Sequence, residues 1–339
     1  MSDAVDEKTN DAAVSSRQLL AEIQGSITQD LESIKAYAVE ALDSDIALIQ
    51  NIGRHISQYG GKRLRPITIT LSARALGYQG QSHIILATIL EFIHVATLLH
   101  DDVVDESSMR RGKASANSIW GNSASVLVGD FFYTRSFEML VIVNRLPIFD
   151  VMARATRRIS EGEVLQLVQL QAADTSESQY FDTIERKTAS LFWAGAQMGA
   201  IIADHSESVQ KQMADYGTNL GIAFQLIDDY LDFAGDSETI GKKVGDDLNE
   251  GKLTLPLIYA RDRGTEAQRK LIESAAKEPD QANVEQVCQI IASTGALEYT
   301  LTLARDYSRR AIENLEFLPQ SKFRESLIKL AQFAYRRNF

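Results

Sequence analysis

The chain has 339 residues, 45% of them hydrophobic, and a formal net charge of −11 at pH 7. This acidic excess argues against nucleic acid and against anionic membrane surfaces as main partners. The hydrophobic content supports a sizeable core. The single cysteine, Cys288, excludes an internal disulfide and a cysteine-based zinc site, which fits a reducing, cytoplasmic location.

Residues 1–16 are polar and lack the apolar segment of a signal peptide, so we expect a flexible N-terminus before one domain over 17–339. From there an apolar period of about 3.6 residues recurs, and most connections are short and carry glycine or proline. We expect helices over 17–25, 27–58, 65–76, 82–104, 115–120, 123–145, 148–172, 177–203, 206–233, 236–240, 253–262, 265–277, 281–293, 296–315 and 320–336. This pattern predicts an all-α domain of many antiparallel helices.

The most apolar stretch, over 124–143, has the length of a membrane span. Asp130, Arg135 and Glu138 interrupt it, and charges inside a span are costly. We therefore expect a fully buried central or interface helix and no transmembrane segment.

Two copies of one acidic pattern, at 101–105 and 228–232, end two of the predicted apolar helices. Their first and last aspartates lie four residues apart, about 400° around a helix, so both carboxylates share a face. Clustered anions at a helix C-terminus repel one another and oppose the helix dipole. Hard oxygen ligands suit Mg²⁺, which proteins usually hold with one or two carboxylates plus substrate phosphates. One such cluster is often a solvated face, but two matching ones predict several Mg²⁺ ions around a diphosphate.

A diphosphate site also needs cations. Lys62 and Arg65 lie in a glycine-containing loop before a predicted helix, where an anion gains from the helix N-terminus. Arg110 and Arg111 follow the first acidic motif within a short loop, and arginine suits bidentate phosphate contacts.

Further polar candidates lie on predicted helices and near glycines. Lys187 sits in an apolar helix, where an unpaired lysine would be costly. Lys242 and Lys252 flank glycines after the second motif and suit a closing loop. His94 and Gln225 lie one or two turns before the two motifs, and each is either a phosphate contact or a buried residue with a local partner.

These motifs together resemble those of the trans-type polyprenyl diphosphate synthase family, most closely its bacterial octaprenyl-forming members. The resemblance covers about 27–339 and is carried, in the same order, by residues 60–66, 91–116, 161–167, 187–189 and 221–252. It implies the isoprenoid synthase type I fold with a large central cavity, a homodimer, and dependence on more than one Mg²⁺ ion per site.

The resemblance also implies roles for single residues. Isopentenyl diphosphate would be held by Lys62, Arg65, His94 and Arg111. The allylic diphosphate would be held by Arg110, Lys187, Thr188, Gln225, Lys242 and Lys252. Direct metal ligands would be Asp101, Asp105 and Asp228, with Asp102, Asp229 and Asp232 as further or outer ligands. The residues expected to carry catalysis are Asp101, Asp105, Arg110, Lys187 and Asp228.

The implied reaction ionises an allylic diphosphate such as farnesyl diphosphate, adds isopentenyl diphosphate to the cation and loses a proton. We expect the product to supply a quinone side chain. Three alternatives stay open: a shorter-chain, geranylgeranyl-type synthase, a class I terpene cyclase, and a non-catalytic subunit of a heteromeric synthase. The intact second motif argues against a cyclase, and two complete motifs argue against a non-catalytic subunit.

Product length depends on what closes the tunnel beneath the first metal site. Ala96 and Thr97, just upstream of Asp101, are small, which is typical of long-chain enzymes in this family, forming octaprenyl or nonaprenyl products. Met139, Leu140 and Met152 are candidates for the tunnel floor, and ordinary core packing explains them equally well.

Overall fold

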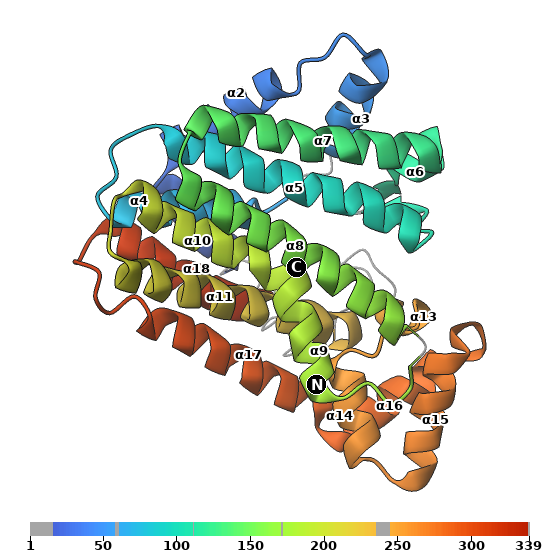
Figure 1. The fold of residues 1–339 in the computed structure, drawn as a ribbon. Coiled ribbons are helices and arrows are strands. Elements are labelled where there is room, and N and C mark those ends of the chain that lie inside the picture. The colour runs from blue at the N-terminus through green and yellow to red at the C-terminus, as the bar shows by residue number, and fades with distance from the viewer. Residues whose placement is uncertain (1–15, 58–60, 111, 171, 235–244, 338–339) are drawn as a thin grey trace.

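Helices form almost everywhere that the apolar period predicts them. In this computed structural model, residues 16–57, 61–110, 112–170, 172–234 and 245–337 are described (Figure 1). The elements are α2 (Thr28–Ala41), α3 (Ala47–Ser57), α4 (Leu64–Ala75), α5 (Ser82–Val104), β1 (Met109–Arg110), β2 (Lys113–Ala114), α6 (Ala116–Trp120), α7 (Asn122–Val143), α8 (Leu146–Gln169), α9 (Glu177–Ile184), the π-helical turn η1 (Glu185–Ala189), α10 (Ser190–Ile202), α11 (Glu207–Ala234), α13 (Asp246–Asn249), α14 (Leu255–Arg263), α15 (Glu266–Lys277), the 3-10 turn η2 (Pro279–Gln281), α16 (Val284–Thr294), α17 (Ala296–Glu313) and α18 (Lys322–Arg336). The prediction of an all-α domain is confirmed.

The structure differs from the predicted elements at a few places. The helix expected over 27–58 is interrupted between α2 and α3, where the hydroxyl of Ser44 accepts a hydrogen bond from the backbone N–H of Ile46 at 3.2 Å. Such local side-chain bonds compete with helix continuation. The antiparallel pair β1–β2 was not predicted, and the helix expected over 177–203 is divided by η1. The helix expected over 236–240 lies outside the described residues.

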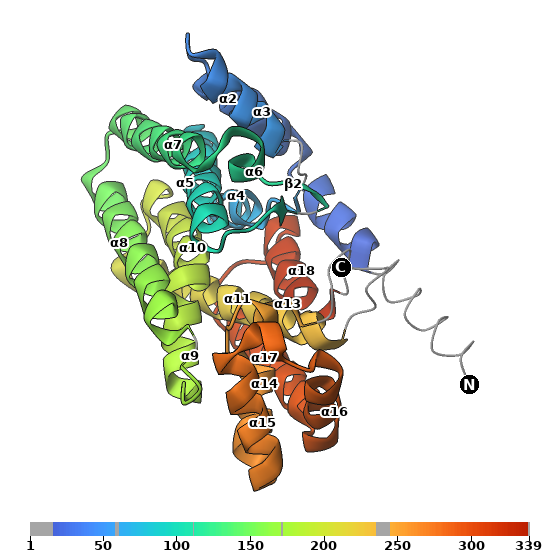
Figure 2. The same ribbon diagram turned by 90° about the vertical axis from the view of Figure 1, so that its right-hand side faces the viewer.

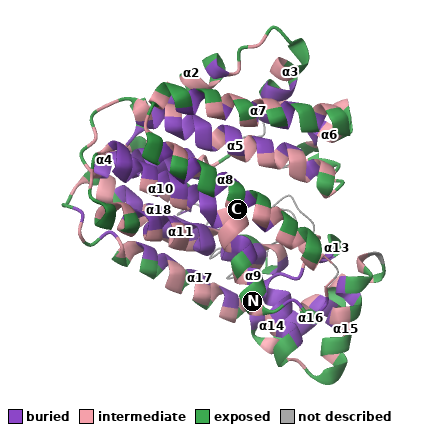
Figure 3. Cartoon of the chain, in the orientation of Figure 1, coloured by how far each residue is buried: buried purple, intermediate pink, exposed green. Residues whose placement is uncertain are grey.

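Helix α10 lies at the centre of the molecule. It packs against α4, α8 and α11, while α11 also packs on α17 and α5 packs on α7 (Figures 1 and 2). Nearly every side chain of α10 is buried, and Figure 3 shows buried residues concentrated along α4 and α10. A helix that is apolar on all sides is stable only inside such a shell.

Helices α10 and α11 approach so closely at Gly217 that only glycine fits at this position. A Cβ atom at Gly217 would lie 2.3 Å from the carbonyl oxygen of Phe192, closer than any real contact. The absence of a side chain at Gly217 therefore sets how closely the two helices approach.

The two long apolar helices α5 and α7 differ in how far they are buried. Helix α5 is long and apolar enough to cross a membrane by length and composition alone, but 61% of its most apolar window is buried in the structure. The prediction of a fully buried helix over 124–143 is wrong for the single chain. Leu127, Val141 and Ile142 of α7 are 67%, 66% and 62% exposed, so α7 is not a fully buried central helix, and the alternative of an interface helix stays a prediction.

The N-terminal boundary of the domain stays a prediction, because residues 1–15 lie outside the described residues. At the start of the described chain, the hydroxyl of Ser16 donates a hydrogen bond to the carbonyl oxygen of Arg336 at 3.0 Å. The first described residue thus contacts the end of α18.

We predict that Gly217→Ala lowers the free energy of unfolding by about 1–3 kcal/mol, because the added methyl group pushes α10 and α11 apart. Gly25→Ala is the matched control, since a Cβ atom there meets nothing within 4 Å. That variant should keep or slightly raise stability. Thermal unfolding of both variants measures the difference, and equal midpoints would contradict the close-approach argument.

Candidate active site

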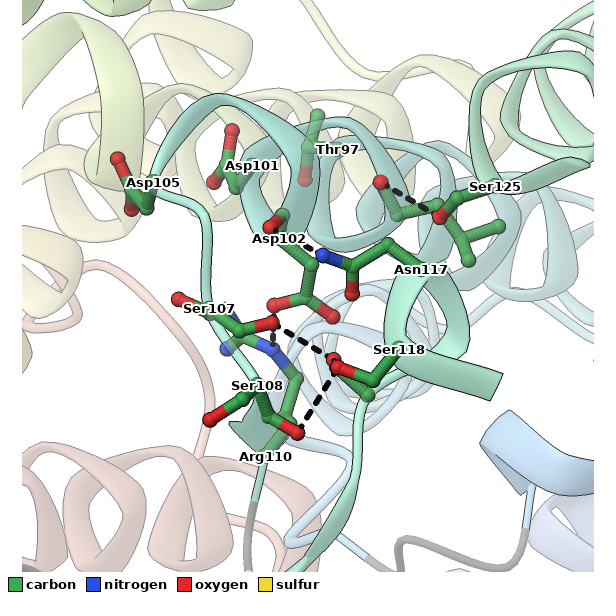
Figure 4. Close-up of polar contacts among 12 residues, drawn as sticks. Thr97, Asp101, Asp102, Asp105, Ser107, Ser108, Arg110, Asn117, Ser118 and Ser125 are labelled. Carbon is green, nitrogen blue, oxygen red and sulfur yellow. Dashed lines mark hydrogen bonds and ion pairs between the residues drawn. The ribbon is translucent and has the colours of Figure 1, made fainter. Parts of the chain in front are cut away.

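The first acidic motif lies at the C-terminal end of α5. Figure 4 shows Asp101 and Asp105 on one side of this helix end and Asp102 on the other. The side chains of Asp101 and Asp105 are 16% and 17% exposed, whereas that of Asp102 is 3% exposed. The four-residue spacing therefore places the outer two carboxylates together, as predicted, and turns the middle one inward.

Asp102 faces the strand pair β1–β2. Its Oδ1 accepts a hydrogen bond from Nε of Arg110 at 2.5 Å, and its backbone oxygen accepts one from Asn117 at 2.9 Å (Figure 4). Burial raises the pKa of Asp102, and the guanidinium of Arg110 opposes this shift. In this structure Asp102 fixes Arg110 behind the motif, so its role as an outer metal ligand stays a prediction.

Two lysines from distant parts of the chain lie beside Asp101 and Asp105. Nζ of Lys187, in η1, lies 3.4 Å from Oδ2 of Asp101. Nζ of Lys252 lies 2.9 Å from Oδ2 of Asp105 and 2.7 Å from Oε2 of Glu250. Burial acts against the charge of Lys252, but the carboxylates of Glu250 and Asp105 outweigh it and raise its pKa. Asp101 and Asp105, the two half-buried carboxylates of the first motif, thus each lie beside an ammonium group.

The first carboxylate of the second motif is paired with the C-terminal end of the chain. Asp228 lies 2.7 Å from Nη2 of Arg337, whose side chain is only 2% exposed. The same guanidinium donates to the carbonyl oxygen of Phe224 at 2.7 Å and covers its ring at 3.8 Å. The residue after α18 is therefore part of the site.

Asp229 is buried in a network of hydrogen bonds. Its Oδ2 accepts from the hydroxyl of Tyr180 at 2.5 Å, and its Oδ1 accepts from Gln225 at 2.7 Å. Gln225 in turn accepts from the hydroxyl of Thr188 at 2.8 Å. Burial and the neighbouring Asp247 raise the pKa of Asp229 well above its usual range. Asp229 therefore orients two residues that were predicted to bind the allylic diphosphate.

Asp232 makes a different contact. Its Oδ1 and Oδ2 accept hydrogen bonds from the backbone N–H groups of Asp246 and Asp247 at 3.1 and 3.2 Å. Both donors lie in the first turn of α13, and the first N–H groups of a helix, which have no acceptor within the helix itself, favour a carboxylate. In this structure Asp232 caps α13, and its expected role as a metal ligand stays a prediction.

Two cavities are lined in part by residues of the two acidic motifs and by the lysines beside them. One, of about 80 Å³, is lined by Ile93, Thr97, His100, Asp101, Tyr133, Thr156, Ile159, Ser160 and Glu163. The other, of about 190 Å³, is lined by Gln166, Gln169, Leu170, Thr175, Tyr180, Thr183, Ile184, Lys187, Thr188, Gln225, Asp229, Asp247, Lys252, Leu253 and Thr254. Lys187 lines the second cavity and contacts Asp101 in the first, so it links the two acidic motifs.

The remaining described substrate candidates, Lys62, Arg65 and His94, line neither of these two cavities. Lys62 and Arg65 are half-buried at the start of α4, where Arg63 adopts a left-handed backbone with φ of 50°. The guanidinium of Arg65 lies 5.1 Å from the centre of the Phe192 ring. His94 is half-buried on α5. Arg111 and Lys242 lie outside the described residues.

The predicted chain-length residues lie in the core. Ala96, Met139, Leu140 and Met152 are all buried and belong to one hydrophobic cluster. The α5 side of the smaller cavity is formed by Ile93, Thr97, His100 and Asp101, and Ala96 is not among its lining residues. The assignment of the four core residues to product length stays a prediction.

The carboxylates fit a hard divalent cation in chemistry. Among the described residues no group of three or more His, Cys, Asp or Glu side chains converges as a ready-made metal site. Mg²⁺ does not need one, because it usually takes one or two protein carboxylates and fills its other positions with water and phosphate oxygens. The half-buried pair Asp101 and Asp105 offers such a partial ligand set.

Three residues at the site were not found from the sequence. Tyr180 is an aromatic residue in an amphipathic helix, and Arg337 belongs to an arginine pair at a helix end. Both patterns are common, so neither marked the residue as part of a site. Glu163 lies in a stretch that resembles a family motif, but its role was not assigned. Its Oε2 accepts from Nζ of Lys187 at 2.6 Å. Burial and then Asp101 raise the pKa of Glu163 to about 7, against the effect of Lys187.

Comparisons with known proteins agree on the kind of protein. The sequence profile described as polyprenyl synthetase matches residues 46–293. The chain is 47% identical over 320 residues to an octaprenyl diphosphate synthase of Escherichia coli, covering 94% of this chain and 99% of the relative. It is 40% identical to a geranyl-diphosphate-specific all-trans-nonaprenyl-diphosphate synthase of Rhodobacter capsulatus, with 93% and 97% covered. A crystal structure of a polyprenyl synthase from Caulobacter crescentus, complexed with calcium and isoprenyl diphosphate, matches with a TM-score of 0.91 and 41% identity, covering 94% and 98%.

We predict that, in metal-free protein, Asp228→Asn lowers the free energy of unfolding by about 1–3 kcal/mol, because the buried guanidinium of Arg337 loses its charged partner. Asp101→Asn is the control, since Lys187 keeps Glu163 as a partner, and its effect should be smaller. Urea unfolding in the presence of a chelator measures both. A larger loss in the Asp101 variant would contradict this reading of the ion pairs.

Proposed function

Because the chain belongs to the polyprenyl synthetase family, we propose that it is a long-chain trans-polyprenyl diphosphate synthase making octaprenyl or nonaprenyl diphosphate. It would add isopentenyl diphosphate repeatedly to an allylic diphosphate such as farnesyl diphosphate, and the product would serve as a quinone side chain. The observation that carries the proposal is the pairing of acidic motifs at the ends of α5 and α11 with lysine and arginine residues from four other segments.

This arrangement supports ionisation of a diphosphate. When bound, Mg²⁺ supplies Lewis-acid neutralisation of the charge on the departing diphosphate, and Asp101, Asp105 and Asp228 would hold it. Lys187 and Lys252 already stand beside these carboxylates and would contact the phosphate oxygens as the reaction proceeds. Such preorganised cations stabilise developing negative charge most strongly where water is excluded.

The network around Asp229 positions the polar residues of the same site. Thr188 and Gln225 are held in one orientation by the buried carboxylate and by Tyr180. We assign no side chain as the general base, and the released pyrophosphate would accept the proton lost after condensation. Lys62, Arg65, His94 and Arg111 would hold isopentenyl diphosphate, and Arg110, Lys242 and Lys252 would complete the allylic site.

The proposal includes a homodimer. Exposed apolar side chains lie on α7 and also on α8, where Val164, Leu167 and Val168 are 59%, 55% and 73% exposed. Soluble chains seldom leave such a surface uncovered, and a second copy with the same surface would cover it. Sedimentation velocity of the purified chain tests this part of the proposal. A cytoplasmic location also stays a prediction.

Purified chain alone, given farnesyl diphosphate, isopentenyl diphosphate and Mg²⁺, should form long linear polyprenyl diphosphates, and chelation of Mg²⁺ should abolish turnover. Asp101→Ala or Asp228→Ala should lower turnover by about 10³-fold or more, because each removes a proposed metal ligand. Asp215→Ala, on the exposed side of α11, is the control and should keep normal turnover. Cyclic products would favour a terpene cyclase, and no product would favour a non-catalytic subunit.

Product length can be tested on α5. Thr97→Phe places a ring in the cavity beside Asp101, so we predict shorter products, of about farnesyl or geranylgeranyl length, from an otherwise active enzyme. Ala96→Phe is the comparison: if the growing chain passes this residue, it shortens products too, and if not, it overpacks the core by about 1–3 kcal/mol. Mass spectrometry of products and thermal unfolding separate these outcomes. Unchanged long products from both variants would remove α5 from the tunnel wall.

A further inference from the structure

Glu163 on α8 faces the same lysine as the first acidic motif. Its Oε2 lies 2.6 Å from Nζ of Lys187, and the same Nζ lies 3.4 Å from Oδ2 of Asp101. Glu163 and Asp101 also line the same small cavity. The ammonium group therefore stands between two carboxylates from different helices, and it makes the shorter contact with Glu163.

The backbones of α8 and η1 are built to meet at this place. A Cβ atom at Gly162 would lie 2.7 Å from the backbone nitrogen of Lys187, so only glycine allows the approach. A second ion pair flanks it, between Glu161 and Arg186 at 2.7 Å. Lys187 itself lies in a π-helical turn, a distortion that is frequent at functional sites. The pair Glu163–Lys187 lies beside Asp101 of the first acidic motif. Glu161, in the flanking pair, is more exposed than Glu163.

Metal binding changes the two contacts of Lys187 in opposite directions. A divalent cation on Asp101 would repel an ammonium group that now lies 3.4 Å from that carboxylate, and this repulsion is strong in a partly buried site. Glu163 would keep its attraction for the same ammonium group. Its Oε2 accepts the hydrogen bond of Lys187 at 2.6 Å, and Glu163 is not among the proposed metal ligands.

We propose that Glu163 is a positioning residue, which holds Lys187 at the diphosphate site once Asp101 is bound to metal. This inference rests on the proposed function, because it takes Lys187 as a contact of the diphosphate. Without Glu163, Lys187 would have to leave the site on metal binding or compete with the metal for Asp101. In either case the diphosphate would lose one charged hydrogen bond.

The test measures binding of inorganic pyrophosphate at saturating Mg²⁺ by isothermal titration calorimetry, without turnover. Glu163→Gln keeps the shape and removes the charge, and it should weaken pyrophosphate binding about tenfold. Lys187→Met should weaken it at least as much. The double variant should bind no more weakly than Lys187→Met, because Glu163 acts through the lysine. Glu161→Gln, two residues away on α8, is the matched control and should bind like the wild type.

Steady-state kinetics adds a second readout. Glu163→Gln should raise the KM for the allylic diphosphate about tenfold and leave the KM for isopentenyl diphosphate unchanged. Wild-type affinity of Glu163→Gln for pyrophosphate would overturn the proposal. Losses that multiply in the double variant would also overturn it, since Glu163 would then act independently of Lys187, for example as a metal ligand. If the wild type itself bound no Mg²⁺-pyrophosphate, the proposed function would fail before this inference is reached.

Discussion

The repulsion between carboxylates gathered at the ends of two apolar helices is the constraint on which this structure depends. Asp101 and Asp105 repel each other and oppose the helix dipole at the C-terminus of α5, so positive charge nearby stabilises this arrangement. The chain supplies this charge from remote segments: η1, the loop after α13 and the residue after α18. The site therefore joins segments that lie far apart in the described chain, and under the proposed function a diphosphate and its metal ions would compensate both sets of charges.

The apolar framework makes this meeting possible. Helix α10 is buried on almost all sides, and glycines at 162 and 217 let α8, η1, α10 and α11 approach to backbone distance. Close packing of this kind resists small displacements. Lys187 and Thr188 are thus held from the inside of the molecule, on a distorted turn between two helices, and they do not depend on a surface loop for their position.

The middle carboxylates of the two motifs share a role that differs from that of the outer ones. Asp102 holds Arg110, and Asp229 holds Gln225, which in turn holds Thr188. Both aspartates are buried, and both use the carboxylate to fix a neighbouring polar side chain. A buried polar group is stable only when its hydrogen bonds are satisfied, so these networks orient the site before any ligand arrives.

The sequence by itself determined what depends on local spacing. Apolar periodicity placed most helices, and the four-residue interval placed Asp101 and Asp105 on one face, because a helix repeats every 3.6 residues wherever it lies. The motifs also gave the family, since their residue types and order suffice. Only the tertiary structure decided which cation meets which carboxylate. Three ion pairs join segments far apart in the chain: Asp105 with Lys252, Asp228 with Arg337 and Lys187 with Glu163. Such contacts follow from how the helices pack, and the local period of the sequence carries no information about that packing.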